Sequence, residues 1–95
     1  MRVISNKALT DFAAKHPMAA VPLQDWRTVV EASFFESFAD LRKAFRTVDV
    51  VGKYHVFDIG GNKYRIVAAI HFNGQRLYIR HVFTHKEYDQ WNKLP

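Results

Sequence analysis

Apolar residues in the first half of the chain recur with the period of α-helices, so this half is predicted to be helical. A short strand at Val3 and Ile4 comes first, and a helix capped by Ser5 follows it. The apolar face of that helix consists of Ala8, Leu9, Phe12 and Ala13. Pro17 ends the helix at or before His16, because the residue before a proline is disfavoured in the α region.

Two further amphipathic stretches precede residue 46. A second helix is predicted to begin near Pro22, and a shorter one covers residues 38–45. The apolar stripe of the second helix comprises Trp26, Val29, Val30, Ser33 and Phe34. Aromatic side chains at this spacing could line a ligand pocket, but they more often pack into a core, and we favour packing.

The second half changes to the two-residue period of strands. Strands are predicted over residues 53–59, 63–72 and 75–83. The Gly-Gly-Asn sequence at 60–62 and the Asn-Gly pair at 73–74 are turn signals, so the three strands form an antiparallel meander.

Alternation along these strands assigns side chains to two faces. On the middle strand, Ile66, Ala68 and Ile70 are predicted to face the helices, and the opposite side carries Arg65, Val67, Ala69 and His71. On the last strand, the helix side is predicted to carry Leu77, Ile79, His81 and Phe83, and the opposite side Arg76, Tyr78, Arg80 and Val82.

A C-terminal helix follows the meander. Thr84 and Glu87 have the spacing of a capping box, and Phe83 and Tyr88 occupy hydrophobic-staple positions around it. The predicted fold class is therefore α+β, with N-terminal helices against one face of an antiparallel sheet and a helix at the C-terminus. At 95 residues and 11.1 kDa, we expect a single domain over 1–95.

Charge and composition narrow the function. The net charge is +5, and residues 53–95 hold seven basic but three acidic side chains, so an anionic partner such as nucleic acid is expected. A mildly basic surface that serves solubility alone is the alternative. The absence of cysteine excludes disulfides, thiolate catalysis and cysteine-based zinc modules. With no signal peptide or apolar run of membrane-spanning length, we expect a soluble cytoplasmic protein with no membrane partner.

The sheet face away from the helices is a candidate platform for phosphates and bases, because guanidinium groups pair well with phosphate. Candidate nucleic-acid contacts are Lys53, His71, Arg76 and Arg80, with Arg65 and Tyr78 on the same face. The open face of any antiparallel sheet is polar, however, and on this pattern alone we favour that simpler interpretation.

The start of the last helix strengthens the case for chemistry. His85 and Lys86 occupy its first two positions, beside unpaired N–H groups that attract anions, and Tyr88 lies one turn further. Each has a plainer explanation: a solvated His85, a Lys86 paired with Glu87 or Asp89, and a Tyr88 that acts only as the staple. His81 and His85 lack a third ligand, so no metal site is predicted, and no cofactor motif is present.

The string Thr-His-Lys-Glu-Tyr-Asp at 84–89, together with residues 56–62, 65–67 and 78–83, resembles the HigB family of bacterial type II toxins. The resemblance covers nearly the whole chain. It implies a RelE-like fold, cleavage of mRNA on the ribosome without a metal, and a helix-turn-helix antitoxin of the HigA type as partner.

The resemblance also implies residue roles. Arg65 would steady the phosphate, and His85 and Lys86 would form the acid/base pair. On physical grounds we expect a base (Lys86 or Tyr88) to take the proton of the RNA 2′-OH and His85 to protonate the leaving oxygen. Arg65, with Arg80, would neutralise the charge that develops on the phosphate. A histidine stands at 85 where some relatives have arginine, which leaves the division between acid and base open. A non-catalytic nucleic-acid-binding module and a gyrase-inhibiting toxin like ParE remain alternatives.

Overall fold

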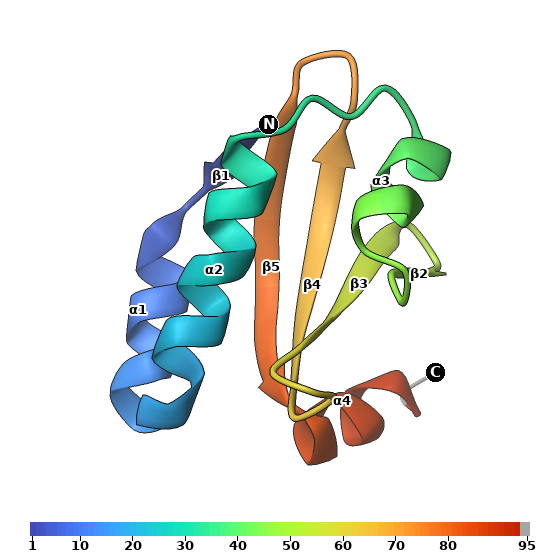
Figure 1. The fold of residues 1–95 in the computed structure, drawn as a ribbon. Coiled ribbons are helices and arrows are strands. Elements are labelled where there is room, and N and C mark those ends of the chain that lie inside the picture. Colours follow the sequence, from blue (N-terminus) through green and yellow to red (C-terminus); the bar gives the residue numbers. More distant parts are fainter. Residues whose placement is uncertain (94–95) are drawn as a thin grey trace.

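A computed structural model describes residues 1–93 of the chain as four α-helices and a five-stranded sheet (Figure 1). The elements in chain order are β1 (Arg2–Ile4), α1 (Asn6–Lys15), the 3-10 turn η1 (Pro17–Ala19), α2 (Ala20–Glu31), α3 (Phe38–Ala44), β2 (Asp49–Val51), β3 (Tyr54–Ile59), β4 (Tyr64–His71), β5 (Arg76–Thr84) and α4 (His85–Asn92). None of these helices is long and apolar enough to cross a membrane.

The strand order is β1-β5-β4-β3-β2, and the predicted meander forms its antiparallel centre. β1 runs parallel to β5 at one edge, and β2 is antiparallel to β3 at the other. The parallel β1–β5 pair makes the sheet mixed and not purely antiparallel as predicted. The sequence pattern did not predict β2. This strand has three residues, two of them exposed, so it shows no burial alternation.

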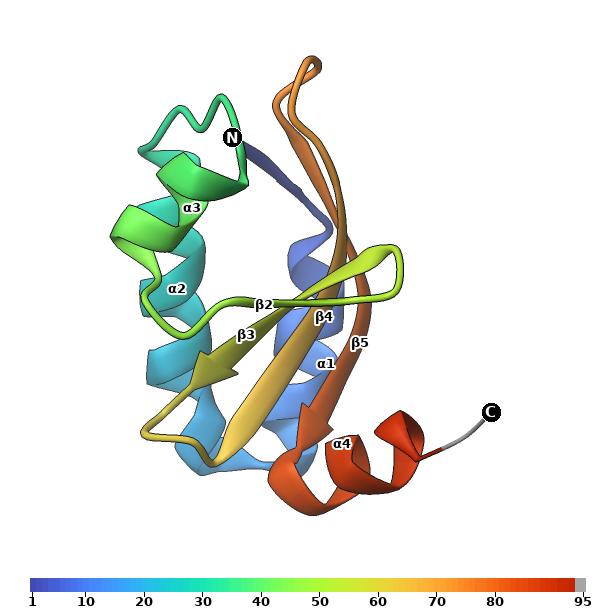
Figure 2. The same ribbon diagram turned by 90° about the vertical axis from the view of Figure 1, so that its right-hand side faces the viewer.

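The main core lies between the sheet and the three N-terminal helices (Figure 2). Leu9, Leu23 and Trp26 from the helices meet Phe57 and Ile66 from the strands, all of them almost fully buried. Burial at this level stabilises by about 1.5–3 kcal/mol for each large side chain. The prediction that Phe34 belongs to the apolar face of α2 is wrong, because the helix ends at Glu31 and Phe34 is 69% exposed.

Helix α4 packs against the other face of the sheet, which is therefore not open as predicted. Its Trp91 ring lies 5.9–6.1 Å from the rings of Phe83 and Tyr54. Val56 and Val67 on this face are buried although they lie outside the main core. The part of this face beneath α4 is thus a second, smaller apolar layer.

A β-bulge at Arg80 changes the face assignment of the last strand. Val67 pairs with His81 but Ala68 pairs with Ile79, so Arg80 is an extra residue on β5. The extra residue inverts the alternation beyond it. The prediction that His81 and Phe83 face the N-terminal helices, and Val82 the opposite side, is therefore wrong. Val82 packs on the main core, and His81 and Phe83 lie against Trp91.

The hairpin between β4 and β5 forms where it was predicted, with a longer turn. His71 and Arg76 are the last paired residues, which leaves a four-residue loop over 72–75. The positive φ of 51° falls on Gln75 and not on the Asn-Gly pair. The Gln75 amide donates to the carbonyl oxygens of Phe35 (2.6 Å) and Phe72 (2.8 Å), which ties this hairpin to the loop after α2.

Candidate active site at the start of the C-terminal helix

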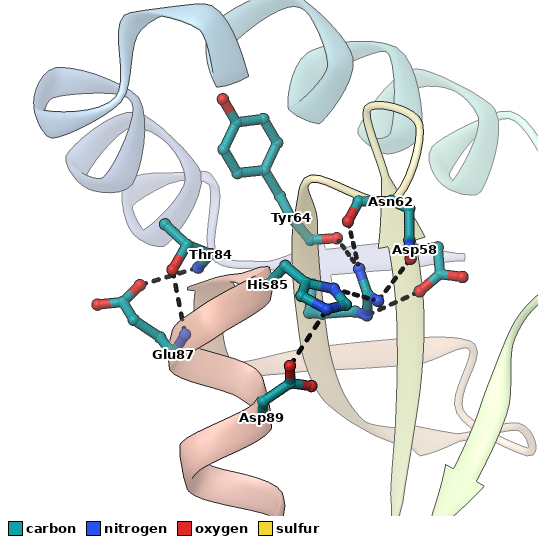
Figure 3. A network of polar contacts seen from close by, with 8 residues as sticks. Asp58, Asn62, Tyr64, Thr84, His85, Glu87 and Asp89 are labelled. Carbon is teal, nitrogen blue, oxygen red and sulfur yellow. Dashed lines mark hydrogen bonds and ion pairs between the residues drawn. The ribbon is translucent and has the colours of Figure 1, made fainter.

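A polar network joins β3, β4 and α4 (Figure 3), and Arg65 is at its centre. It points away from the main core, on the same face as Asp58 and Phe83, and is 7% exposed. Its Nε–H donates to Asp58 at 2.8 Å. The other donors contact the Tyr64 carbonyl oxygen (3.1 Å), the carbonyl and side-chain oxygens of Asn62, and Nδ1 of His85 (2.9 Å). All five N–H groups of this guanidinium are therefore engaged.

The turn between β3 and β4 supplies two of these contacts. Gly60, Gly61 and Asn62 all have positive φ, between 63° and 75°. Glycine adopts this left-handed region freely, and asparagine is among the few other residues that tolerate it. The turn carries the Asn62 oxygens back to Arg65, three residues further on. The Gly-Gly-Asn sequence is thus both a hairpin turn and a clamp for the arginine.

The contacts of His85 fix its tautomer. A guanidinium can only donate, so Nδ1 of His85 accepts from Arg65 and carries no proton. The proton is then on Nε2, which donates to Asp89 at 3.1 Å, one turn along α4. In this arrangement the imidazole is neutral, and its one lone pair is occupied by Arg65.

The predicted capping box holds His85 in place. Thr84 Oγ1 accepts from the Glu87 N–H (3.2 Å), and the Glu87 carboxylate accepts from the Thr84 N–H (2.8 Å). The backbone N–H of His85 donates to the Lys63 carbonyl oxygen at 2.9 Å. The first turn of α4 is thereby joined to the beginning of β4, the strand that carries Arg65.

Tyr88 covers the other side of the arginine. Its ring lies 5.5 Å from Cζ of Arg65, a cation–π distance. Burial, followed by the nearby carboxylate of Asp49, raises the pKa of the Tyr88 hydroxyl above its usual value of 10.0, although Arg65 acts in the opposite direction. A raised pKa keeps the phenol protonated at neutral pH. Tyr88 can therefore donate a hydrogen bond, but it is poorly suited to the base role that the resemblance allowed it.

Lys86 projects into solvent from the same turn. The acidic partners that might have occupied it are engaged elsewhere, since Asp89 pairs with His85 and Glu87 completes the cap. Within residues 1–93, the side chain of Lys86 has no ion-pair or hydrogen-bond partner. Its ammonium is available to a ligand.

The four predicted nucleic-acid contacts do not share one location. Arg80 stacks over Tyr78 (5.3 Å) at the bulge, and Lys53 lies over Tyr54 (5.4 Å) in the turn before β3. His71 and Arg76 lie at the far end of the β4–β5 hairpin. Six residues separate His71 from Arg65 along β4, or roughly 20 Å at about 3.3 Å per residue. A single bound phosphate could not contact both ends of the face.

Sequence reasoning missed three members of the network: Asp58, Asn62 and Asp89. Asp89 had a usable signal, because it is four residues after His85 on a predicted helix. Asp58 faces Arg65 across the strands, which a correct hairpin register would have indicated. Nothing in the sequence pattern indicated the Asn62 clamp. Among the described residues no group of three or more histidine, cysteine or carboxylate side chains is placed to hold a metal ion.

The fold and this site define a class of protein: a small basic α+β domain that brings guanidinium, imidazole and phenol side chains together where its last helix begins. The sequence model of the family described as "HigB_toxin, RelE-like toxic component of a toxin-antitoxin system" matches residues 19–91. The chain therefore belongs to the HigB toxin family, and this membership implies an antitoxin as its partner.

Individual relatives agree with the family match. The "mRNA interferase toxin HigB" of Escherichia coli K12 is 38% identical over 92 residues, which cover 94% of this chain and 88% of the relative. The "mRNA interferase HigB" of Shigella flexneri matches to the same extent. That of Escherichia coli O6:H1 is 32% identical over 93 residues, covering 95% of this chain and 90% of the relative.

Proposed function

We propose that this toxin is an mRNA interferase, an endoribonuclease that cleaves messages by attack of an RNA 2′-OH on the adjacent phosphate. The observation that carries the proposal is the contact of Arg65 with Nδ1 of His85 at the solvent-facing start of α4. The relatives named mRNA interferases support it, since the chain aligns with most of their length.

Every N–H donor of Arg65 already has an acceptor, so the binding of a substrate must begin with the exchange of one acceptor. Arg65 has no vacant donor, so a phosphate oxygen must displace an existing acceptor. His85 is the acceptor on the exposed side, and a neutral imidazole binds a guanidinium less strongly than a charged phosphate does. A phosphate that takes the Nη2–H of Arg65 releases the lone pair of His85 at the moment of binding.

The released imidazole can act as a base, because the lone pair of its Nδ1 is then vacant. Nδ1 of His85 takes the proton of the 2′-OH while O2′ attacks phosphorus. The bond from phosphorus to O5′ breaks, and the ammonium of Lys86 gives a proton to that oxygen. The products are a 2′,3′-cyclic phosphate and a 5′-hydroxyl. This assignment reverses the role first expected for His85, because its contacts with Arg65 and Asp89 imply the tautomer whose Nδ1 is a base.

Arg65 and Tyr88 stabilise the negative charge that develops on the phosphate. A guanidinium and a neutral phenol both donate hydrogen bonds, and one well-placed donor of this kind contributes about 10²–10³ in rate. General acid–base transfer by His85 and Lys86 adds about 10²–10⁴. Both effects require the RNA to be aligned with the site.

We further propose the ribosome as the platform that provides this alignment, in the cytoplasm where messages are translated. The spread of Lys53, His71, Arg76 and Arg80 over the sheet supports contacts with an extended backbone. For the antitoxin we propose a HigA-type protein with a helix-turn-helix domain. Co-expression of this antitoxin with the toxin should restore growth.

The experiment is expression of the toxin without antitoxin, followed by mapping of message ends. We expect new ends with the wild type, and at least about 100-fold fewer with His85→Ala. Lys43→Gln, which removes an exposed lysine from α3, is the control and should cleave like the wild type. Growth arrest without new ends, accompanied by loss of DNA supercoiling, would instead indicate a gyrase inhibitor. Salt-sensitive RNA binding without cleavage would indicate a binding module.

A further inference from the structure

A cleft of about 280 Å³ lies between α1 and β5 and extends to Glu87 in the first turn of α4. Its apolar lining comes from Ala8, Phe12, Ile79 and Val82, and its polar lining from Asp11, Lys15, His16, Arg80, His81 and Glu87. Among the polar residues, Arg80 is a proposed RNA contact and Glu87 caps the helix that carries His85, and the other four have no role in the proposed function. The cleft is large enough for about one nucleobase.

The cleft lies where the edge strand β1 ends and no longer pairs with β5. β1 pairs with β5 only from Arg76 to Tyr78, so within residues 1–93 no strand covers the next six residues on that side. The bulge at Arg80 falls at this point. Bulges are frequent beside functional sites because they redirect a side chain. Here the bulge places Arg80 at the rim of the cleft.

The lining of the cleft includes a pair of stacked aromatic rings. His16 stacks on Phe12 with ring centroids 4.4 Å apart and planes inclined by 27°. Tyr64 meets the Phe12 ring edge-on at 5.7 Å and supports it from the core. Bases of single-stranded RNA bind surfaces of this kind by stacking, with little dependence on sequence.

The charges around the cleft favour a base over a phosphate. Lys15 and Arg80 provide donors, but the carboxylates of Asp11 and Glu87 lie in the same lining and repel an anion. Asp11 pairs with Lys7 at 2.7 Å, and Glu87 accepts from the N–H of Thr84 at 2.8 Å, so both carboxylates offer acceptor oxygens in the lining. A nucleobase edge presents the matching mixture of N–H donors and oxygen or nitrogen acceptors.

Glu87 connects the cleft to the proposed catalytic residues. It lies two residues after His85, in the first turn of α4, and its side chain points away from that of His85 (Figure 3). A strand that crosses this turn therefore has the Arg65–His85 contact on one side and the cleft on the other. We propose that the cleft is a nucleotide subsite, which binds the base next to the scissile linkage and so contributes to cleavage preference. The inference rests on the proposed nuclease function.

Two measurements test the subsite. In the first, nucleoside monophosphates are titrated into isotope-labelled wild-type toxin, alone and without ribosomes. We expect shifts in the amide signals of Phe12, His16 and Val82, and binding at least about fivefold weaker in His16→Ala, the loss expected from removing one stacked aromatic. His16→Phe, which keeps a ring, should retain the affinity.

In the second measurement, message ends are mapped for the wild type, His16→Ala, Lys15→Gln and the control Lys43→Gln. We expect the first two variants to change the distribution of bases flanking the cuts, and Lys43→Gln to leave it unchanged. An unchanged distribution, together with nucleotide binding unaffected by His16→Ala, would overturn the subsite while the nuclease assignment stands. No cleavage by the wild type would overturn the nuclease assignment, and the titration would then decide whether the cleft binds nucleotides at all.

Discussion

At the scale of single residues, the five contacts of Arg65 explain how a charged side chain is buried on a sheet face. Asp58 balances its charge, and the oxygens of Asn62 and Tyr64 satisfy donors that would otherwise lose hydrogen bonds to water. An unpaired buried charge is costly, but a fully paired one can be retained for a function. The same saturation means that Arg65 must exchange a partner before it can bind a substrate.

Asn62 should contribute to the free energy of unfolding in two ways, through its side chain and through its backbone conformation. Asn62→Gly keeps the left-handed φ of 75° but removes the side-chain acceptor of Arg65, which should lower the free energy of unfolding by about 1.5 kcal/mol. Asn62→Ala removes the same acceptor and adds about 1 kcal/mol of backbone strain. Urea unfolding of both variants measures the difference, and equal losses would show that the turn does not require a left-handed residue.

The tautomer of His85 is directly observable. We expect ring ¹⁵N signals of neutral His85 to show the proton on Nε2, because Arg65 occupies Nδ1 and Asp89 accepts from Nε2. Asp89→Ala should weaken this preference and lower cleavage, and Asp89→Asn, whose amide oxygen still accepts, should retain most of both. A wild-type ring protonated on Nδ1 would contradict the assignment of His85 as the base.

His55 should make stability depend on pH on the acidic side. Burial lowers the pKa of His55 below 6.5, and its Nδ1 has no hydrogen-bond partner among the described residues. The unfolded chain then binds more protons than the folded one, so the stability present above pH 6.5 is lost as the pH falls towards the lowered value. His55→Phe should reduce this loss in urea unfolding at pH 5 against pH 7.5. If His55→Phe loses as much stability between pH 7.5 and pH 5 as the wild type does, His55 is not the cause. His71→Phe, which replaces an exposed histidine, is the control.

At the scale of elements, the cap of α4 links stability to activity. Thr84→Ala removes the acceptor of the Glu87 N–H and should cost about 1 kcal/mol, with a fall in cleavage because His85 is the next residue. Ser37→Ala removes the corresponding cap of α3, far from His85. This control should lose similar stability but keep its cleavage rate once both variants are assayed well below their melting temperatures. Equal activity in the two variants would show that the cap does not position His85.

The elements also show which parts of the fold a sequence can predict. The meander and the capping box depend on neighbours in the chain, so their signals are local, and both are confirmed. The bulge at Arg80 depends on how β5 meets β4, and one extra residue reversed the faces of His81 and Phe83. Strand β2 exists only because β3 provides an edge to pair with.

The same distinction applies to the candidate site. His85, Lys86 and Tyr88 could be selected from the sequence because they follow a recognisable cap, and Arg65 from strand alternation and family resemblance. The contact between Arg65 and His85 joins residues 20 apart in sequence and depends on the backbone bond from His85 to Lys63. No local pattern contains that information. The catalytic roles of these residues remain predictions.

At the scale of the whole molecule, two clusters lie on either side of one helix start. The Arg65–His85 network occupies one side of the first turn of α4, and the cleft between α1 and β5 occupies the other. The basic residues Lys53, Arg76 and Arg80 lie elsewhere on the sheet and the turns that border it. The net charge of +5 favours the approach of the toxin to RNA. This arrangement suits an enzyme whose substrate is an extended strand held by a larger assembly.

The chemistry of the cut ends tests the central claim most directly. Purified toxin is added to ribosomes that carry a defined message, and the termini of the two fragments are identified by end-specific ligation and mass spectrometry. Attack by the 2′-OH predicts a 2′,3′-cyclic phosphate on one fragment and a 5′-hydroxyl on the other, with both absent for His85→Ala and present for Lys43→Gln. A 5′-phosphate and a 3′-hydroxyl, or unchanged cleavage by His85→Ala, would contradict the account.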